Sequence, residues 1–249
     1  TGMMPHEIGV NGNNMSIPRD MRTPELGHIM NDSGYDCAYG GKWHVPEMDI
    51  DEGHGFEKIC GISDWDLPGK CVEYITAKRD KPFFLVASFD NPHNICEYSR
   101  RQSLPRGKIE VPPPEECPNL PYNFRAGPYE PQAIRAEQAA NPQFFIGGSL
   151  TPDEWRQYIY AYYRMVEMVD RSVARILDAL DQAKLTENTV IIFSSDHGDG
   201  LIAHQWNQKW VLYEESVRVP LIISHPHYDH ANAIEGALVS NGLDLYPTR

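Results

Sequence analysis

The chain has 249 residues, of which 41% are hydrophobic and 10% aromatic, a composition typical of a folded globular protein. Its net charge of −13, from 22 basic and 35 acidic residues, excludes a general binder of nucleic acids or anionic membranes, because such binding needs a basic surface. The five cysteines are odd in number and show no C-x-x-C spacing, which disfavours a zinc module or a disulfide framework, although one or two bridges stay compatible with the sequence.

The first part of the chain places two polar side chains just past a predicted strand. Residues 1–14 are rich in turn-forming glycine and asparagine and predict a loop. The apolar spacing predicts a helix over 23–33 and a short strand over 35–39, followed by two glycines that allow a sharp turn. This turn leads into Lys42 and His44, which put a fixed cation beside a titratable base.

A third candidate residue follows the next predicted strand. Residues 48–66 are acidic and predict an exposed loop, and 71–79 predict an amphipathic helix. The apolar run over 83–89 then predicts a buried strand. His93 comes just after this strand, where an imidazole is suited to general acid catalysis.

The middle of the chain combines an irregular segment with one long helix. Residues 97–150 are rich in proline, most densely over 105–145, and predict an irregular insertion that serves as a functional loop or lid. A helix is predicted over 151–184, because Thr, Pro, Asp and Glu open it and apolar side chains follow at helical spacing. We expect this stripe to pack in the core: Tyr158, Ala161, Tyr162, Met165, Val169, Val173, Ile176, Leu177 and Leu180.

The richest stretch of polar residues lies between the last two clear strands. An apolar run over 190–193 predicts a buried strand that ends just before Asp196 and His197. Lys209 follows, and a further strand is predicted over 219–224. Ligands of open α/β sheets bind at the carboxyl ends of strands, so an acid and an imidazole at this point form half of a candidate metal site.

The long pattern around Asp196 resembles a known family. D-H-G-D, then His204, Lys209 and Y-E-E-S-x-R-V-P-L-I over 213–222 resemble the type I, formylglycine-dependent sulfatases of the alkaline phosphatase superfamily. Other motifs of that family occur in the same order: T-G-x-x-P-H-x-x-G-V at 1–10, G-K-W-H at 41–44 and P-H at 92–93. The resemblance implies an α/β fold with a mostly parallel sheet between helices, and a single partial catalytic domain over 1–249 that is incomplete at both ends.

The resemblance also implies a reaction, which is hydrolysis of a sulfate ester by a formylglycine nucleophile beside one Ca²⁺ ion. Asp196 and His197 would belong to the metal site, with His197 standing where many members have Asn. A hard cation suits this role because it polarises sulfate oxygens.

The remaining roles implied by the resemblance concern the sulfate group and its leaving alcohol. Lys42 and Lys209 would hold sulfate oxygens as point charges. His44 would assist turnover of the formylglycine, and His93 would protonate the leaving oxygen. His204 would line the sulfate pocket or the pocket for the first sugar.

The family's C/S-x-P-S-R nucleophile motif and its paired N-terminal aspartates do not occur in the chain. Cys96 opens only a C-x-x-S-R spacing, and it follows motifs that the family's nucleophile precedes. We therefore expect a parent sulfatase, matured by a formylglycine-generating enzyme, whose nucleophile lies upstream, and we expect the chain alone to be inactive and to expose an apolar strand edge.

Several alternatives stay open at this point. A phosphodiesterase or phosphonate hydrolase of the same superfamily shares the D-H-G and lysine pattern, and a catalytically inactive, glycan-binding relative would also keep the fold. A sulfated carbohydrate is the favoured substrate, but aryl sulfates, glycosaminoglycans, mucin glycans and algal polysaccharides are all compatible. Family resemblance predicts a periplasmic, secreted or cell-surface location without membrane insertion. A histidine-rich cluster at 225–230 is expected to be an exposed loop and not a metal site.

Overall fold

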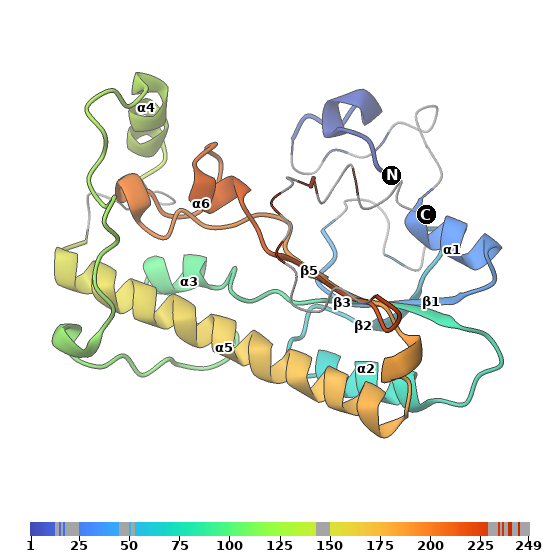
Figure 1. Ribbon diagram of the computed structural model, residues 1–249. Coiled ribbons are helices and arrows are strands. Elements are labelled where there is room, and N and C mark those ends of the chain that lie inside the picture. Colours follow the sequence, from blue (N-terminus) through green and yellow to red (C-terminus); the bar gives the residue numbers. More distant parts are fainter. Residues whose placement is uncertain are drawn as a thin grey trace. The chain divides into compact units, whose positions relative to one another are not determined.

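The computed structural model describes residues 1–12, 15, 17, 25–44, 50, 53–142, 150–228, 234, 236, 239, 240 and 244 (Figure 1). The chain divides into two compact units. Unit 1 comprises Thr1–Asp90, Ser172–Ile191 and Ile223–Arg249, and unit 2 comprises Asn91–Arg171 and Ile192–Ile222. The sequence also predicts a last strand over 235–240, and the family resemblance implies a helix start over 242–248; most of these residues are outside the described ones.

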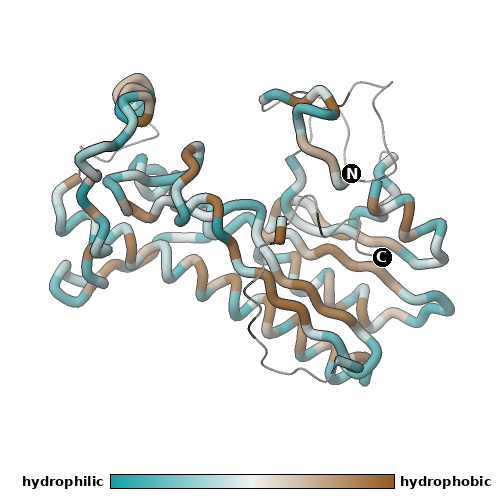
Figure 2. The backbone as a smooth tube through the Cα atoms, turned by 45° about the horizontal axis from the view of Figure 1, so that its top comes forward, coloured by the Kyte–Doolittle hydropathy of each residue, from teal (hydrophilic) through white to brown (hydrophobic). Residues whose placement is uncertain are grey.

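Unit 1 is built on a parallel sheet of three strands, β1 (Asp36–Gly41), β2 (Glu57–Cys60) and β3 (Phe83–Ser88). The strand order is β2-β1-β3, and Asp36 of β1 lies opposite Phe83 of β3. The strands predicted over 35–39 and 83–89 are confirmed as β1 and β3, and the continuous apolar run of β3 is typical of a parallel strand. Figure 2 shows hydrophobic stretches along the strands and along parts of the helices.

The prediction of an exposed loop over 48–66 is wrong at Glu57–Cys60, which form β2. This strand has only four residues, and its first two, Glu57 and Lys58, are exposed. No apolar run therefore marks it in the sequence. It forms because its backbone pairs in parallel with β1, where Ala38 lies opposite Glu57 and Tyr39 opposite Lys58.

The helices of unit 1 cover this sheet and share its core. They are α1 (Leu26–Asp32) and α2 (Leu67–Thr76), and α2 starts before the predicted helix because Leu67 and Pro68 form its buried first turn. Ile75 of α2 packs with Phe83 and Leu85 of β3 and with Leu180. Leu180 comes from the last part of the long helix α5 (Pro152–Gln182).

Helix α5 begins with the predicted cap. The backbone N–H of Thr151 donates to the Glu154 carboxylate at 2.8 Å, and the N–H of Glu154 donates to the Thr151 hydroxyl at 3.3 Å, which forms a capping box. Most of the predicted apolar stripe is at least partly buried, but Leu177 is 39% exposed, so its assignment to the core was wrong.

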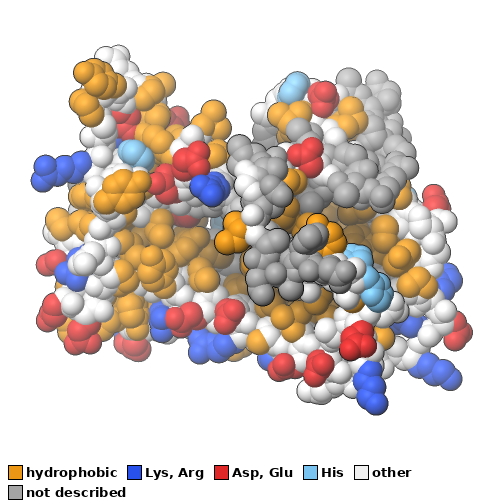
Figure 3. All heavy atoms as spheres, viewed as in Figure 1, with side chains coloured by type: hydrophobic (Ala, Val, Ile, Leu, Met, Phe, Trp, Pro, Cys, Tyr) orange, Lys and Arg blue, Asp and Glu red, His pale blue; other side chains and the backbone are white. Residues whose placement is uncertain are grey.

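Unit 2 packs irregular chain against the first part of α5. Trp155, Tyr158 and Met165 of α5 are buried in a core with Ile95 and Ile202. The remaining helical elements of this unit are α3 (Ile95–Ser99), η3 (Pro114–Glu116), α4 (Gln132–Ala140), η5 (Ala203–Gln205) and α6 (Glu214–Val217). On the face shown in Figure 3, hydrophobic side chains gather between α5 and α6.

The proline-rich segment over 97–150 has an ordered attachment to α5 in its described part. Arg156 donates to the carbonyl oxygens of Cys117 and Pro118, at 2.8 and 3.1 Å. Gln157 donates to the carbonyl of Pro112 at 3.1 Å. These bonds satisfy backbone groups that have no partner within regular secondary structure.

A separate two-stranded sheet pairs β4 (Ile191–Ser194) with β5 (Leu221–Ser224). Both strands lie within two residues of their predicted bounds. Ile192, Phe193, Ile222 and Ile223 are all more than a third exposed, so these strands present apolar side chains to solvent, and the prediction that β4 is a buried strand was wrong. With the parallel sheet of unit 1 and the flanking helices, they give the α/β class that was predicted.

None of the helices in the described part of the chain combines the length and apolar character that a membrane crossing requires. The five cysteines are all free thiols, so the disulfides left open by the sequence are not formed.

Candidate active site

The carboxyl end of β1 holds Lys42 in a defined position. Gly41 has a φ of 99°, and a Cβ there would collide with the carbonyl oxygen of Ser88 at the end of β3. The N–H of Lys42 donates to the same carbonyl at 2.8 Å. Glycine is therefore required for the close approach that starts the G-K-W-H motif.

The Lys42 side chain is paired across the sheet edge. Its ammonium lies 3.0 Å from the Asp90 carboxylate, and both side chains are largely shielded from solvent. The backbone N–H of Asp90 donates to the Asp64 carboxylate at 2.9 Å. The carboxyl ends of β1 and β3 are thus joined by an ion pair that also orients the predicted sulfate-binding lysine.

The two remaining residues of the first motifs differ in exposure. His44 lies two residues beyond Lys42 and is exposed. His93 lies beyond the end of β3, is partly buried, and belongs to the turn in which Asn94 donates to the Asn91 side chain at 2.8 Å. Lys42 and His44 belong to unit 1, and His93, Asp196, His197, His204 and Lys209 belong to unit 2.

Asp196 and His197 follow the carboxyl end of β4, and their potential metal-ligand atoms, Oδ2 and Nε2, face each other. The Nδ1 of His197 lies 2.7 Å from the Gly198 carbonyl oxygen, and only a protonated ring nitrogen can donate to that acceptor. In the neutral ring, Nε2 then keeps its lone pair, and it lies 3.3 Å from Oδ2 of Asp196. Two ligands of one cation have such a separation when metal–ligand distances are about 2.3–2.6 Å.

These two donors fit part of a divalent cation's coordination sphere. Ca²⁺ takes about six to eight ligands, mostly oxygen. Within the described residues, no third His, Cys, Asp or Glu joins the pair. Asp196 is 78% exposed at its side chain, so it is accessible to a cation that other ligands also hold.

Gly198 explains the glycine of the D-H-G motif. Its N–H donates to the Ser216 carbonyl at 2.9 Å, and a Cβ at this position would collide with the carbonyl of Glu215. The turn that carries Asp196 and His197 therefore ends directly against α6, with no room for a side chain at Gly198.

The segment 199–210 forms a closed loop with a strained backbone. Gly200 and Ile202 donate to the carbonyls of Gln208 and Trp206, at 2.7 and 2.8 Å. Six of its non-glycine residues have a positive φ: Leu201, Ile202, His204, Gln205, Gln208 and Trp210. Such conformations persist only where surrounding contacts enforce them, and they concentrate at functional sites.

The buried Asp199 carboxylate accepts hydrogen bonds from backbone N–H groups of this loop. It accepts the Leu201 N–H at 2.8 Å. Burial raises the pKa of Asp199, whereas the hydrogen bonds from Leu201 and Gln208 and the charge of Lys209 oppose that shift. Its negative charge also adds to the burial that raises the pKa of Tyr158, which is fully buried in α5.

His204 lies at the centre of a second polar cluster. Its ring stacks on Tyr213, with centroids 4.3 Å apart and an interplanar angle of 20°. Its backbone N–H donates to the Asn123 carbonyl at 2.8 Å, and its carbonyl accepts from Arg135 at 3.0 Å. The proline-rich segment thus reaches one of the predicted substrate residues.

Several residues that support the candidate site were not predicted from the sequence. Asp90 had a signal, because it is an acid placed directly after a strand, like Asp196. Asp199 had a weaker one, as the second acid of D-H-G-D. Asn123 and Arg135 lie in an irregular segment, where no periodicity indicates which side chains point inward.

Cys96 and the histidine-rich cluster at 225–230 differ in how much of each the structure describes. Cys96 is buried, and burial raises the pKa of its thiol to about 11, so it stays a protonated thiol and not a nucleophile. His225 and His227 are exposed, and Asp229 and His230 of the same cluster lie outside the described residues.

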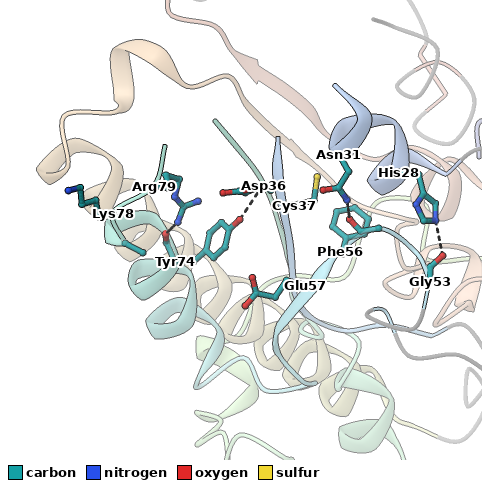
Figure 4. A pocket seen from close by; sticks show the side chains of 12 residues that line it. His28, Asn31, Asp36, Cys37, Gly53, Phe56, Glu57, Tyr74, Lys78 and Arg79 are labelled. Atoms are coloured by element: carbon teal, nitrogen blue, oxygen red, sulfur yellow. Dashed lines mark hydrogen bonds between the residues drawn. The ribbon is translucent and has the colours of Figure 1, made fainter. Parts of the chain in front are cut away.

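Unit 1 also has a pocket of about 850 Å³ at the opposite end of its strands (Figure 4). Asp36 and Glu57, the first residues of β1 and β2, line it together with Tyr74 and Arg79. The Tyr74 hydroxyl donates to the Asp36 carbonyl at 3.1 Å, and the Arg79 guanidinium covers the Tyr74 ring at 4.1 Å. This pocket contains none of the predicted site residues.

Comparison with known proteins supports the resemblance seen in the motifs. The Sulfatase family model matches residues 1–248. The chain is 28% identical to the Delta 4,5-hexuronate-2-O-sulfatase of Bacteroides thetaiotaomicron, over 100% of this chain and 55% of that protein. It is 25% identical to the ulvan-active sulfatase of Formosa agariphila, over 100% of this chain and 49% of that protein.

A solved structure of a 2-O GAG sulfatase has the same fold. It superposes with a TM-score of 0.83 at 26% identity, covering 99% of this chain and 57% of that one. The chain thus spans about half the length of the relatives it matches.

Proposed function

Because the chain belongs to the sulfatase family, we propose that the intact protein hydrolyses sulfate esters of a carbohydrate. The observation that carries this proposal is the Asp196–His197 pair, whose donor atoms stand 3.3 Å apart at a strand end with the imidazole tautomer set by Gly198. The names of the relatives support a glycan as substrate, since they include a hexuronate sulfatase and an ulvan-active sulfatase.

The proposal includes a divalent cation, Ca²⁺ by family, and a formylglycine nucleophile. Asp196 and His197 would hold the cation, which supplies polarisation of the sulfate oxygens. The carboxylate oxygen is the stronger ligand for a hard cation, whereas His197 contributes a softer nitrogen.

The lysines would neutralise the sulfate group. Lys42 carries a charge whose direction is set by Asp90 at 3.0 Å, so sulfate can approach a cation already in place. Lys209 lies at the end of the closed loop, where its carbonyl accepts the Trp206 indole N–H at 2.9 Å. Both side chains would bind sulfate oxygens as point charges.

His93 and His44 would act in proton transfer. His93 would donate a proton to the leaving oxygen of the sugar, and His44 would assist turnover of the nucleophile. General acid catalysis of this kind contributes about 10²–10⁴ in rate. The contribution is largest for a sugar alcohol, because an alkoxide is a poor leaving group without a proton.

The test is release of inorganic sulfate by the intact protein, co-expressed with a formylglycine-generating enzyme. Sulfated saccharides and 4-nitrophenyl sulfate should both be hydrolysed. His93→Gln should lose about 10²–10⁴ in kcat/KM on the saccharide and much less on 4-nitrophenyl sulfate, whose leaving group needs no proton.

Other outcomes point to the alternatives. Faster hydrolysis of a phosphonate monoester than of any sulfate ester would indicate the phosphonate hydrolase alternative. Saccharide binding without turnover, in a protein whose nucleophile position is neither Cys nor Ser, would indicate a glycan-binding relative.

A further inference from the structure

The proline-rich segment holds His204 in one orientation and one tautomer. The side-chain amide of Asn123 donates to Glu215 at 2.7 Å, which identifies its nitrogen, since a carboxylate only accepts. The same nitrogen lies 3.4 Å from Nε2 of His204. An amide NH₂ has two protons, so the second one faces Nε2 and makes that ring atom the acceptor.

The consequence is a proton on Nδ1 of His204. A neutral imidazole carries one N–H, and with Nε2 accepting, Nδ1 must donate. Among the described residues, no side chain or carbonyl accepts a hydrogen bond from Nδ1, and the ring is only partly buried. The cluster therefore presents one oriented N–H donor.

An ion pair clamps the main chain of His204 from the other side. Arg135 donates to the His204 carbonyl at 3.0 Å, to the Gln138 side chain at 2.7 Å and to the Glu130 carboxylate. Glu130 also accepts from the Tyr213 hydroxyl, and its side chain is only 7% exposed. Arg135 and Glu130 thus link the main chain of His204 to the ring on which it stacks.

The clamp accounts for an unfavourable backbone. His204 has a φ of 54°, in the left-handed region that non-glycine residues rarely adopt. Four contacts hold it there: the two to Asn123, the one to Arg135 and the stack on Tyr213. A costly conformation held by a dedicated network indicates that the direction of the ring matters.

We propose that Asn123, Glu130, Arg135 and Tyr213 are positioning residues that aim Nδ1–H of His204 at an acceptor oxygen of the sulfated sugar, a ring hydroxyl or a carboxylate. This inference rests on the proposed sulfatase function and assigns part of its sugar selectivity to the segment 123–138. Two almost fully exposed rings lie next to residues of this network in the sequence, Tyr122 beside Asn123 and Tyr129 beside Glu130.

The experiment compares two substrates in the intact protein. One is a sulfated saccharide, and the other is 4-nitrophenyl sulfate, which lacks the sugar oxygen that His204 would bind. Asn123→Ala and Arg135→Lys should raise KM for the saccharide about tenfold, with kcat within about threefold, and leave KM for 4-nitrophenyl sulfate unchanged. Tyr213→Phe keeps the ring and removes the hydroxyl, so it should give a smaller rise in the same direction.

The matched control is Arg101→Gln, which breaks an exposed Arg–Glu pair with Glu154, 3.2 Å apart, in the same unit. It should leave both substrates unaffected. A merely structural role for the cluster would reduce the active fraction, so both substrates would lose kcat equally with unchanged KM. That result would overturn the proposal.

A second readout does not need turnover. The ¹⁵N chemical shifts of the His204 ring should report Nδ1–H in the wild-type protein and a mixture of tautomers in Asn123→Ala. An Nε2–H tautomer in the wild-type protein would refute the positioning network even if sulfate is released. The expected shifts in a protein that releases no sulfate would leave the network intact and count only against the sulfatase function.

Discussion

The ammonium of Lys42 lies 3.0 Å from the carboxylate of Asp90, and this pair joins the carboxyl ends of two parallel strands. A lysine side chain has four rotatable bonds, so an unpaired one would sample many directions. Asp90 selects the direction in which the charge points before any sulfate arrives.

Removing this partner should weaken catalysis more than stability. Asp90→Asn keeps the shape but removes the charge, and we expect kcat/KM for a sulfate ester to fall about tenfold. Asp36→Asn is the matched control, since Asp36 pairs with Lys81 at 3.8 Å at the other end of β1, where both side chains are exposed. Equal losses in both variants would contradict a role for Asp90 in aiming Lys42.

The approach of Gly41 to Ser88 predicts a large difference between two glycine substitutions. Gly34 and Gly41 have similar backbone angles, φ of 92° and 99°, but a Cβ at Gly34 meets nothing within 4 Å. Gly34→Ala should therefore cost about 1–2 kcal/mol, the strain of a left-handed residue. Gly41→Ala should cost at least about 2 kcal/mol more, measured by thermal unfolding, because its methyl group displaces β3. Similar costs for the two would show that β3 can move aside.

Asp199 should make stability fall as the pH rises. Burial raises its pKa above the ordinary value of 3.8, so the folded state binds the proton more tightly than the unfolded chain does. The stabilisation is fully present below pH 3.8 and is lost as the pH rises through the folded pKa. Asp199→Asn should therefore gain stability relative to the wild-type protein between about pH 4 and pH 7 in urea unfolding.

Glu154→Gln provides a control in which the change of stability with pH is expected to have the opposite sign. Hydrogen bonds from Thr151 lower the pKa of Glu154 below its ordinary value of 4.5. Its stabilisation is present above pH 4.5 and is lost as the pH falls, so the variant should be less stable than the wild-type protein near neutrality and converge with it in acid. A constant difference between either variant and the wild-type protein across the range would contradict these assignments.

The cysteines should react in an order set by burial. Burial raises the pKa of Cys71 to about 12 and that of Cys96 to about 11, so both are protonated at pH 8 and shielded from reagents. Cys60 is partly exposed. Iodoacetamide at pH 8 should alkylate Cys60 first, and Cys71 and Cys96 only in denaturant, as mass spectrometry of the peptides can show. Rapid labelling of Cys96 in the folded protein would restore it as a candidate nucleophile.

The elements that carry the motifs were predictable because their own residues mark them. Strands β3 and β4 are apolar runs, β1 is a short stretch closed by two glycines, and α5 has both a cap and an apolar stripe. Strand β2 was missed because its ladder with β1, and not its own composition, holds it. Helix α4 was missed because none of its described residues is buried, so no apolar stripe marks it.

The residues of the candidate site divide in a similar way. Those next to a strand end, such as Lys42 and Asp196, could be found from the sequence. Their partners could not, because Asp90 reaches Lys42 across a sheet and Arg135 reaches His204 from an irregular segment. Such contacts depend on tertiary packing, which no local pattern records.

The closed loop from Asp199 to Trp210 has a consequence for how the molecule can change in length. Gly200 pairs with Gln208 and Ile202 with Trp206, so one extra residue would break both pairs and turn His204 and Lys209 away from their present directions. In its described part, the proline-rich segment is attached to α5 by side-chain hydrogen bonds from Arg156 and Gln157. Among related proteins, insertions and deletions should therefore be common in the proline-rich segment and rare in the closed loop. New substrate specificities would then arise through changes in the length of the proline-rich segment, while the closed loop keeps its length.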